Sequence, residues 1–248
     1  MPNAKSLSIV CFLILCFAIV RAPASLLERI VSIQPQSSIQ FASYAGTLWQ
    51  GSGTINLNGF LDSGLSWSIP LQDILKLNPK VLWTIEGVGL TLKGESILLY
   101  QEVKTIAKGQ INSTLLNNVF APYDVLLDGD LLIKTISITN KVEENFEMTD
   151  LTGDLQWTGG PISYVLSQTP ITVISPFFQL NLSNQPGGLI HATLDSPTHG
   201  YHLLTATLDP KGILKMQVSK GFTKIFGNEW PGRASDDQII LELEERIF

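Results

Sequence analysis

The side chains best suited to chemistry in this sequence are three histidines that lie close to one another. They are His191, His199 and His202, and Asp195 lies among them. Imidazole and carboxylate groups together can hold zinc, so the spacing raises the question of a metal site. However, Pro197 interrupts the strand pattern, and His199-Gly200 is typical of a turn. We therefore predict solvated strand histidines and no bound metal.

The sequence carries no signature of a known catalytic or nucleotide-binding site. There is no Gly-x-Ser-x-Gly elbow, His-Glu-x-x-His helix, Walker loop or dinucleotide fingerprint. Both cysteines, Cys11 and Cys16, lie in the apolar N-terminal run, which excludes a disulfide framework or a thiolate site elsewhere. We predict no catalytic residues, no cofactor and no enzyme. An envelope enzyme is the alternative if His199, His202, Asp195 and Asp209 converge around one cavity.

Composition limits the partners of the chain. Charged residues make up 15% of the 248 residues, the formal net charge is -6, and 44% of residues are hydrophobic. The chain lacks the basic field that nucleic-acid binding requires, so nucleic acid is not an expected partner. The hydrophobic content is sufficient for a packed core.

The N-terminus predicts export across a membrane. Residues 7–20 carry no charge and end at Arg21, and Lys5 is the charge on the short leading side. By the positive-inside rule, we expect a cytoplasmic start at 1–5, a transmembrane anchor with a helical extension at 6–33, and a periplasmic β-rich domain at 34–248. The small residues around Pro23 also fit a cleaved signal peptide, and both interpretations stay open.

Most of the remaining chain shows the two-residue alternation of half-buried strands. Residues 55–58 and 178–182 alternate in this way, and residues 204–208 and 214–218 form a hairpin candidate through 209–212. Asp128-Gly129 predicts a tight turn between the strands at 126–127 and 131–133. The fold class is therefore all-β, with mainly antiparallel sheets. Short helical signals at 70–77, 113–120 and 221–226 predict connecting helices, and the tail at 235–248 fits either a last strand or a mobile end.

A weak internal echo suggests two similar β halves, at 41–120 and 122–226. Its two copies are Gly46-Thr47-Leu48-Trp49-Gln50-Gly51 and Gly153-Asp154-Leu155-Gln156-Trp157-Thr158-Gly159. The tryptophan is displaced by one residue between the copies, which would change the sheet face that it occupies. The five tryptophans favour core packing, and the alternative is an apolar sheet face left open for lipid or a partner strand.

The order of these parts resembles protein N of the bacterial type II secretion system. The resemblance rests on the N-terminal apolar segment, residues 46–51, Leu65-Ser66-Trp67-Ser68-Ile69-Pro70, Gly129-Asp130-Leu131, residues 153–159 and residues 201–208. Ser52 and Gly53 depart from the pattern, which has a basic residue and alanine in many relatives.

The resemblance implies an accessory, single-pass component of the bacterial inner membrane with its bulk in the periplasm. Such a protein would support export of folded proteins across the outer membrane through contacts with other type II secretion inner-membrane subunits. The candidate contact residues are Leu48, Trp49, Gly51 and Trp157, although core structure also accounts for them. The alternative function is a membrane-anchored β-groove module that binds or transfers lipid. An apolar sheet face uncovered over more than ~10 Å would favour that alternative.

Overall fold

The computed structural model describes residues 13–14, 17–27, 39–57, 61–74, 78–141, 148–166, 168–228 and 230–246. The chain divides into two compact units, Met1–Val88 and Gly89–Phe248, called here the N-terminal and C-terminal units. The predicted halves at 41–120 and 122–226 remain a prediction. Each unit is built mainly from antiparallel strands, as the alternating sequence pattern predicts.

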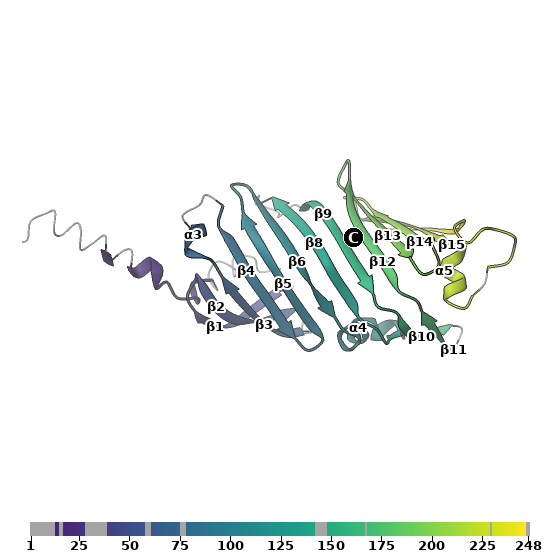
Figure 1. Ribbon diagram of the computed structural model, residues 1–248, viewed down its shortest axis with the longest axis horizontal. Helices are drawn as coiled ribbons and strands as arrows, with labels where there is room; N and C mark the ends of the chain where they lie inside the picture. Colours follow the sequence, from purple (N-terminus) through teal and green to yellow (C-terminus); the bar gives the residue numbers. More distant parts are fainter. Residues whose placement is uncertain are drawn as a thin grey trace, which may run out of the picture. The chain divides into compact units, whose positions relative to one another are not determined.

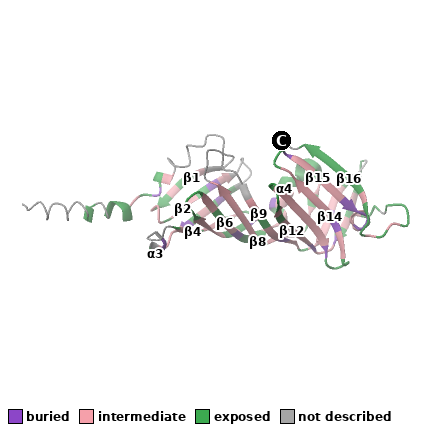
Figure 2. Ribbon diagram, turned by 90° about the horizontal axis from the view of Figure 1, so that it is seen from above, coloured by how far each residue is buried: buried purple, intermediate pink, exposed green. Residues whose placement is uncertain are grey.

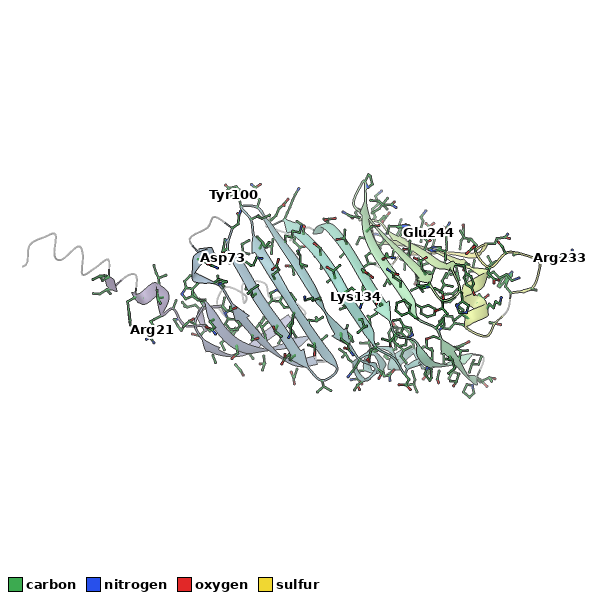
Figure 3. The ribbon with its side chains drawn as sticks, in the orientation of Figure 1. Arg21, Asp73, Tyr100, Lys134, Arg233 and Glu244 are labelled. Atoms are coloured by element: carbon green, nitrogen blue, oxygen red, sulfur yellow. The ribbon has the colours of Figure 1, made fainter. Side chains whose placement is uncertain are left out.

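Among its described residues, the N-terminal unit contains four strands in the order β1-β2-β3-β4, and each pairs antiparallel with its neighbour. They are β1 (Ile39–Gly46), β2 (Gln50–Leu57), β3 (Leu61–Ser68) and β4 (Lys80–Gly87). The short helix α3 (Leu71–Ile74) follows β3 and contains the buried Asp73, which is labelled in Figure 3. Helix α3 lies within the predicted helical stretch at 70–77.

The C-terminal unit contains a large sheet, a small sheet and short helices. The large sheet has the order β5-β6-β8-β9-β12-β13-β14-β15-β16, and the small sheet has the order β11-β10-β7 (Figure 1). Its first elements are β5 (Leu90–Leu98), β6 (Glu102–Ile111), α4 (Ser113–Phe120), η1 (Ala121–Tyr123), β7 (Leu126–Leu127), β8 (Leu131–Lys141) and β9 (Met148–Trp157). The rest are β10 (Gly160–Leu166), β11 (Thr169–Ser175), β12 (Phe178–Gln185), β13 (Leu189–Ser196), β14 (Tyr201–Leu208), β15 (Ile213–Ser219), α5 (Lys220–Ile225) and β16 (Ile239–Arg246).

The predicted hairpin at 204–218 is confirmed as β14 and β15. Leu204 opposes Val218, and Leu208 opposes Leu214. The Asp209 carboxylate accepts hydrogen bonds from the main-chain N–H groups of Lys211 and Ile213, at 2.8 and 2.9 Å. Aspartate is favoured in turns because its side chain can satisfy nearby main-chain donors in this way.

The predicted turn at Asp128-Gly129 is wrong as a hairpin. Leu126 and Leu127 pair with β10 of the small sheet, whereas β8 belongs to the large sheet. Residues 128–130 therefore connect two sheets. A glycine is required there because a Cβ at Gly129 would overlap the indole ring of Trp157. Asp128-Gly129 indicates that the chain changes direction, but it does not indicate which strand pairs with which.

Two of the predicted short helices are confirmed with identifiable caps. Helix α4 begins after Asn112, whose side chain accepts a hydrogen bond from the N–H of Leu115. Helix α5 begins after Ser219, whose hydroxyl accepts from the N–H of Phe222. Such caps satisfy N–H groups that have no partner within the helix. The tail at 235–248, which fitted either a last strand or a mobile end, forms strand β16 over Ile239–Arg246.

Much of the predicted anchor at 6–33 lies outside the described residues. Residues 13–14, 17–20 and 26–27 are helical. No helix among the residues that the structure describes is both long enough and apolar enough to span a membrane.

Candidate functional site

One face of the large sheet in the C-terminal unit is lined by apolar side chains from strand to strand. Residues that oppose each other across neighbouring strands share a face, so the register defines rows of side chains. Three rows, extended by Leu241 and Leu243 on β16, make up what we call the apolar face. The rows are Leu90, Ile111, Leu131, Trp157 and Phe178; Ile133, Leu155, Leu180, Leu194, Leu204 and Val218; and Ile136, Gly153, Leu182, Ala192, Ala206 and Met216.

The opposite face of the same sheet is polar. One of its rows crosses seven strands and consists of Thr135, Asp154, Asn181, Thr193, Thr205, Gln217 and Glu242. A second row is formed by His191, Thr207, Lys215 and Glu244. We call this side the polar face. The two-sided pattern is that of an antiparallel sheet with one face in water.

One part of the apolar face is covered by α5 and the small sheet. The Phe178 ring stacks on Phe226 with centroids 6.4 Å apart, and Phe222 lies 4.6 Å from Phe226. The Tyr164 hydroxyl donates to the main-chain oxygen of Phe226 at 2.7 Å, which joins β10 to the end of α5. In this part of the sheet Phe178 and Val218 are buried. The cover therefore encloses a local core.

Elsewhere on the apolar face burial is mixed, because Leu90 and Leu155 are buried and many of the other members are half-buried. Ile133, Ile136 and Leu182 are all half-buried. In Figure 2 most strands of this sheet are pink, the colour of intermediate burial. Leu98 on β5 is 39% exposed, and Leu243 on β16 is 44% exposed. Strands β5, β6, β8 and β9 together span about 15 Å at the usual strand spacing. Leu90, Ala107 and Leu155 on these strands are buried, so the exposed apolar surface is smaller than this width. Exposed apolar surface is typical of a site for a partner or an apolar ligand.

In each unit a tryptophan ring packs against a glycine. In the N-terminal unit Gly51 on β2 opposes Trp67 on β3, and a Cβ at Gly51 would overlap the Trp67 ring. In the C-terminal unit Gly129 lies against Trp157 in the same way. The indole N–H of Trp67 donates to the main-chain oxygen of Leu48 at 3.1 Å, and that of Trp157 donates to the Ser175 hydroxyl at 2.7 Å.

This arrangement places the candidate contact residues differently from the sequence echo. The sequence echo aligns Trp49 with Trp157. In the structure, however, Trp67 and not Trp49 packs against a glycine as Trp157 does. Leu48 and Gly51 both contact Trp67. The main-chain oxygen of Leu48 accepts a hydrogen bond from the indole N–H, and Gly51 lies against the indole ring. Gly51 lies on the strand next to Trp67, whereas Gly129 lies in the connection between β7 and β8.

Trp49 instead contacts the N-terminal segment. Its indole N–H donates to the main-chain oxygen of Ile19 at 2.8 Å. The N–H of Leu48 donates to the oxygen of Ala22 at 2.9 Å, and the N–H of Ala24 donates to the oxygen of Gly46 at 3.1 Å. Residues 46–49 are thus hydrogen-bonded to residues 19–24 and hold this segment against the sheet.

The residues that suggested catalysis converge only in part. Asp195 and His202 lie on the polar face, where Oδ1 of Asp195 is 2.6 Å from Nδ1 of His202. The second ring nitrogen of His202 lies 2.6 Å from the hydroxyl of Thr205. His199 bonds to Ser196 instead, and Asp209 occupies the hairpin turn.

This carboxylate–imidazole–hydroxyl chain is chemically suggestive, because a carboxylate can orient an imidazole that accepts a hydroxyl proton. Its side chains are open to water, with Asp195 37% and His202 38% exposed. The Asp195–His202 contact ties β13 to β14, whereas His202 and Thr205 both lie on β14, and we assign these contacts a structural role. In the described part of the chain, no three histidine, cysteine, aspartate or glutamate residues are grouped so as to hold a metal ion.

Comparisons with known proteins find no relative. The chain matches no protein-family model, and neither the curated proteins nor the solved structures contain a match.

Proposed function

We propose that this chain is an accessory subunit of the bacterial type II secretion system, held at the inner membrane by residues 6–33 with its β-rich units in the periplasm. The resemblance of the sequence to protein N of that system supports the role. The observation that carries the proposal is that the N-terminal segment is hydrogen-bonded to the motif at residues 46–51. Trp49, Leu48 and Gly46 hold residues 19–24 through three hydrogen bonds.

A sheet fastened to a membrane anchor in this way would stay close to other membrane-bound subunits. Confinement raises the effective concentration of each partner, so contacts that are weak in solution become sufficient. The role requires no catalytic step. The apolar face and the strand edges are the surfaces available for contact with other subunits.

The test is site-specific photo-crosslinking of the full-length protein in Gram-negative envelopes that contain the secretion system. One variant carries the photoreactive residue at Ile136, on the apolar face, and its matched control carries it at the adjacent Thr135, on the polar face. The proposal expects adducts with type II secretion inner-membrane proteins at one of these positions. Adducts with none of these proteins at either position would contradict it.

We also propose a second candidate function, the binding or transfer of lipid, because the apolar face is half-buried over several neighbouring strands. Acyl chains are flexible apolar ligands, and burial of apolar surface stabilises their complexes by about 25 cal/mol per Å². The same crosslinking experiment separates the two functions. Phospholipid or lipopolysaccharide adducts at Ile136 and not at Thr135 would favour lipid handling, and equal labelling at both positions would oppose it.

A further inference from the structure

Strand β16 is the last strand of the large sheet, and no described strand pairs with its outer edge. It pairs with β15 from Ile239 to Arg246 and is the terminal strand in the sheet order. Among the strands that the structure describes, β15 is its single neighbour. An edge strand presents main-chain N–H and C=O groups on which another strand can be added.

The apolar side of β16 is incompletely covered. Leu241 and Leu243 are 39% and 44% exposed, and they extend the row of Val218 and the row of Met216. A strand added beside β16 would bring apolar side chains against both leucines. The edge thus offers apolar contact in addition to main-chain hydrogen bonds.

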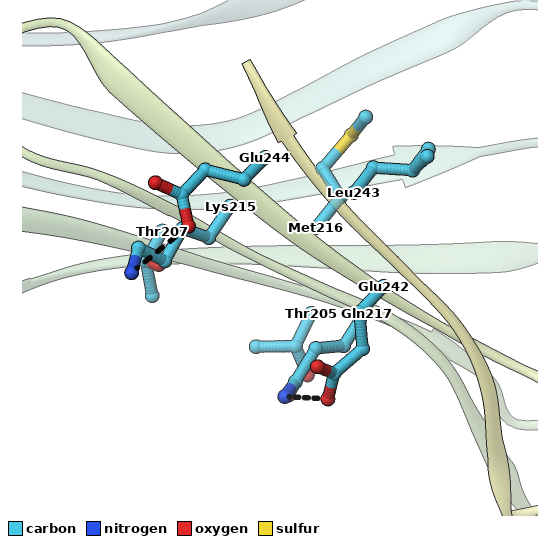
Figure 4. A pocket seen from close by; sticks show the side chains of 8 residues that line it. All are labelled: Thr205, Thr207, Lys215, Met216, Gln217, Glu242, Leu243 and Glu244. Atoms are coloured by element: carbon cyan, nitrogen blue, oxygen red, sulfur yellow. Dashed lines mark hydrogen bonds and ion pairs between the residues drawn. The ribbon is translucent and has the colours of Figure 1, made fainter. Parts of the chain in front are cut away.

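The polar side of β16 is acidic and faces a hollow of about 540 Å³. Figure 4 shows Glu242 and Glu244 directed to one side of the strand and Leu243 to the other. Lys215 lies 3.2 Å from the Glu244 carboxylate, and the Gln217 amide donates to Glu242 at 2.9 Å. The hollow is lined by Thr205, Thr207, Lys215, Met216, Gln217, Glu242, Leu243 and Glu244. It provides room for long side chains from a neighbouring strand.

We propose that the edge of β16 binds an extended segment of a partner protein in which apolar and basic residues alternate. The apolar residues cover Leu241 and Leu243, and the Lys or Arg side chains reach Glu242 and Glu244. Charge explains the choice of partner, because opposite charges on neighbouring strands attract and like charges repel. The inference is independent of the secretion role, since it depends only on β16 and on strands β14 and β15 beside it in the sheet order.

A second copy of β16 would be a poor partner for the same reason. In an antiparallel pair centred on Leu243, Glu242 of each copy would oppose Glu244 of the other. Two such pairs of carboxylates would repel each other. The acidic side chains therefore discourage self-association at this edge and leave it available to a basic strand.

The proposal can be tested with the full-length protein in detergent and a fluorescent eight-residue peptide of alternating valine and lysine. Fluorescence anisotropy measures binding, and the matched probe replaces each lysine by glutamate. We expect the basic peptide to bind at least about tenfold more tightly than the acidic peptide. The double variant Glu242→Lys/Glu244→Lys should reverse this preference. The control variant Asp62→Lys/Glu86→Lys, with the same charge change in the N-terminal unit, should retain it.

A second measurement distinguishes strand addition from simple charge attraction and uses the unaltered protein. Two further basic peptides carry N-methyl groups on alternate residues, one on the odd and one on the even positions. In a strand pair, alternate N–H groups point toward the partner strand. One methylated peptide should therefore lose binding while the other retains it. Equal binding of both methylated peptides, or an unchanged preference in the Glu242→Lys/Glu244→Lys variant, would overturn the proposal.

Discussion

The indole N–H of Trp49 donates to the main-chain oxygen of Ile19, thirty positions earlier in the chain, at 2.8 Å. This bond joins the first turn of the β structure to the segment that precedes it. The neighbouring bonds of Leu48 and Ala24 act in the same place. The motif residues 46–51 therefore serve as an attachment for the N-terminal segment.

Replacing Trp49 by phenylalanine should weaken this attachment. The variant keeps an aromatic ring and loses one hydrogen bond, so we expect a loss of about 1 kcal/mol in the free energy of unfolding. Trp49→Ala should cost about 2 kcal/mol, less than the 3 to 5 kcal/mol typical of a fully buried tryptophan, because Trp49 is only half-buried. Urea unfolding of the full-length protein measures both values. An unchanged Trp49→Phe midpoint would show that the bond adds no stability.

The seat of Trp67 on Gly51 predicts a strong effect of a single methyl group. In Gly51→Ala the new Cβ would overlap the indole ring, so we expect a loss of about 1 to 3 kcal/mol of stability. Gly64→Ala is the matched control on the adjacent strand. Its Cβ would lie 3.5 Å from the Glu86 oxygen, an ordinary contact, and it should be nearly neutral. Similar losses in both variants would refute a specific role for the indole.

The two faces of β8 should respond differently to charge. Ile136→Asp places a carboxylate on the apolar face, whereas Ser137→Asp places one on the polar face, opposite the uncharged Thr152. If the apolar face is accessible to ligands, the first variant should reduce the binding of a fluorescent fatty acid several-fold, because burying an unpaired charge is costly. The second variant should bind as the unaltered protein does. Equal binding by both variants would place the fatty acid elsewhere.

Stability should fall at high pH through Tyr201. Burial, followed by the nearby Asp236 carboxylate, raises the pKa of its phenol above the ordinary value of 10.0. Because the unfolded chain ionises first, this contribution is complete below about pH 10 and is lost as the pH rises through the folded pKa. Unfolding midpoints measured from pH 8 to pH 11 should therefore decrease more steeply than in Tyr201→Phe. Parallel curves would rule out the shift.

The sequence alone was sufficient for the features that depend on neighbouring residues. The alternation at 178–182 and 204–208 predicted strands and the side chains that share a face, because successive residues in a strand point to opposite sides. Asp209 marked the hairpin, and the helices after Asn112 and Ser219 lie where short helices were expected. These choices involve only local conformation and short-range hydrogen bonds.

The tertiary structure decided which segments meet. It paired Leu126 and Leu127 with the small sheet instead of β8, and it placed Trp67 in the environment that Trp157 occupies in the other unit. His202 meets Asp195 because Leu203 is an extra residue in β14, which shifts the register by one position. Such outcomes depend on packing between residues far apart in the chain, which alternation cannot specify.

The extent of the open apolar face was likewise decided by the tertiary structure. Alternation predicted that residues 178–182 form a half-buried strand, but it did not predict what covers the apolar side of that strand. In the folded chain Phe178 and Val218 lie under the cover formed by α5 and the small sheet, while Ile136 remains half-buried. The physical reason is that a side chain's direction is a local property of its strand, whereas its burial depends on which distant element packs against it.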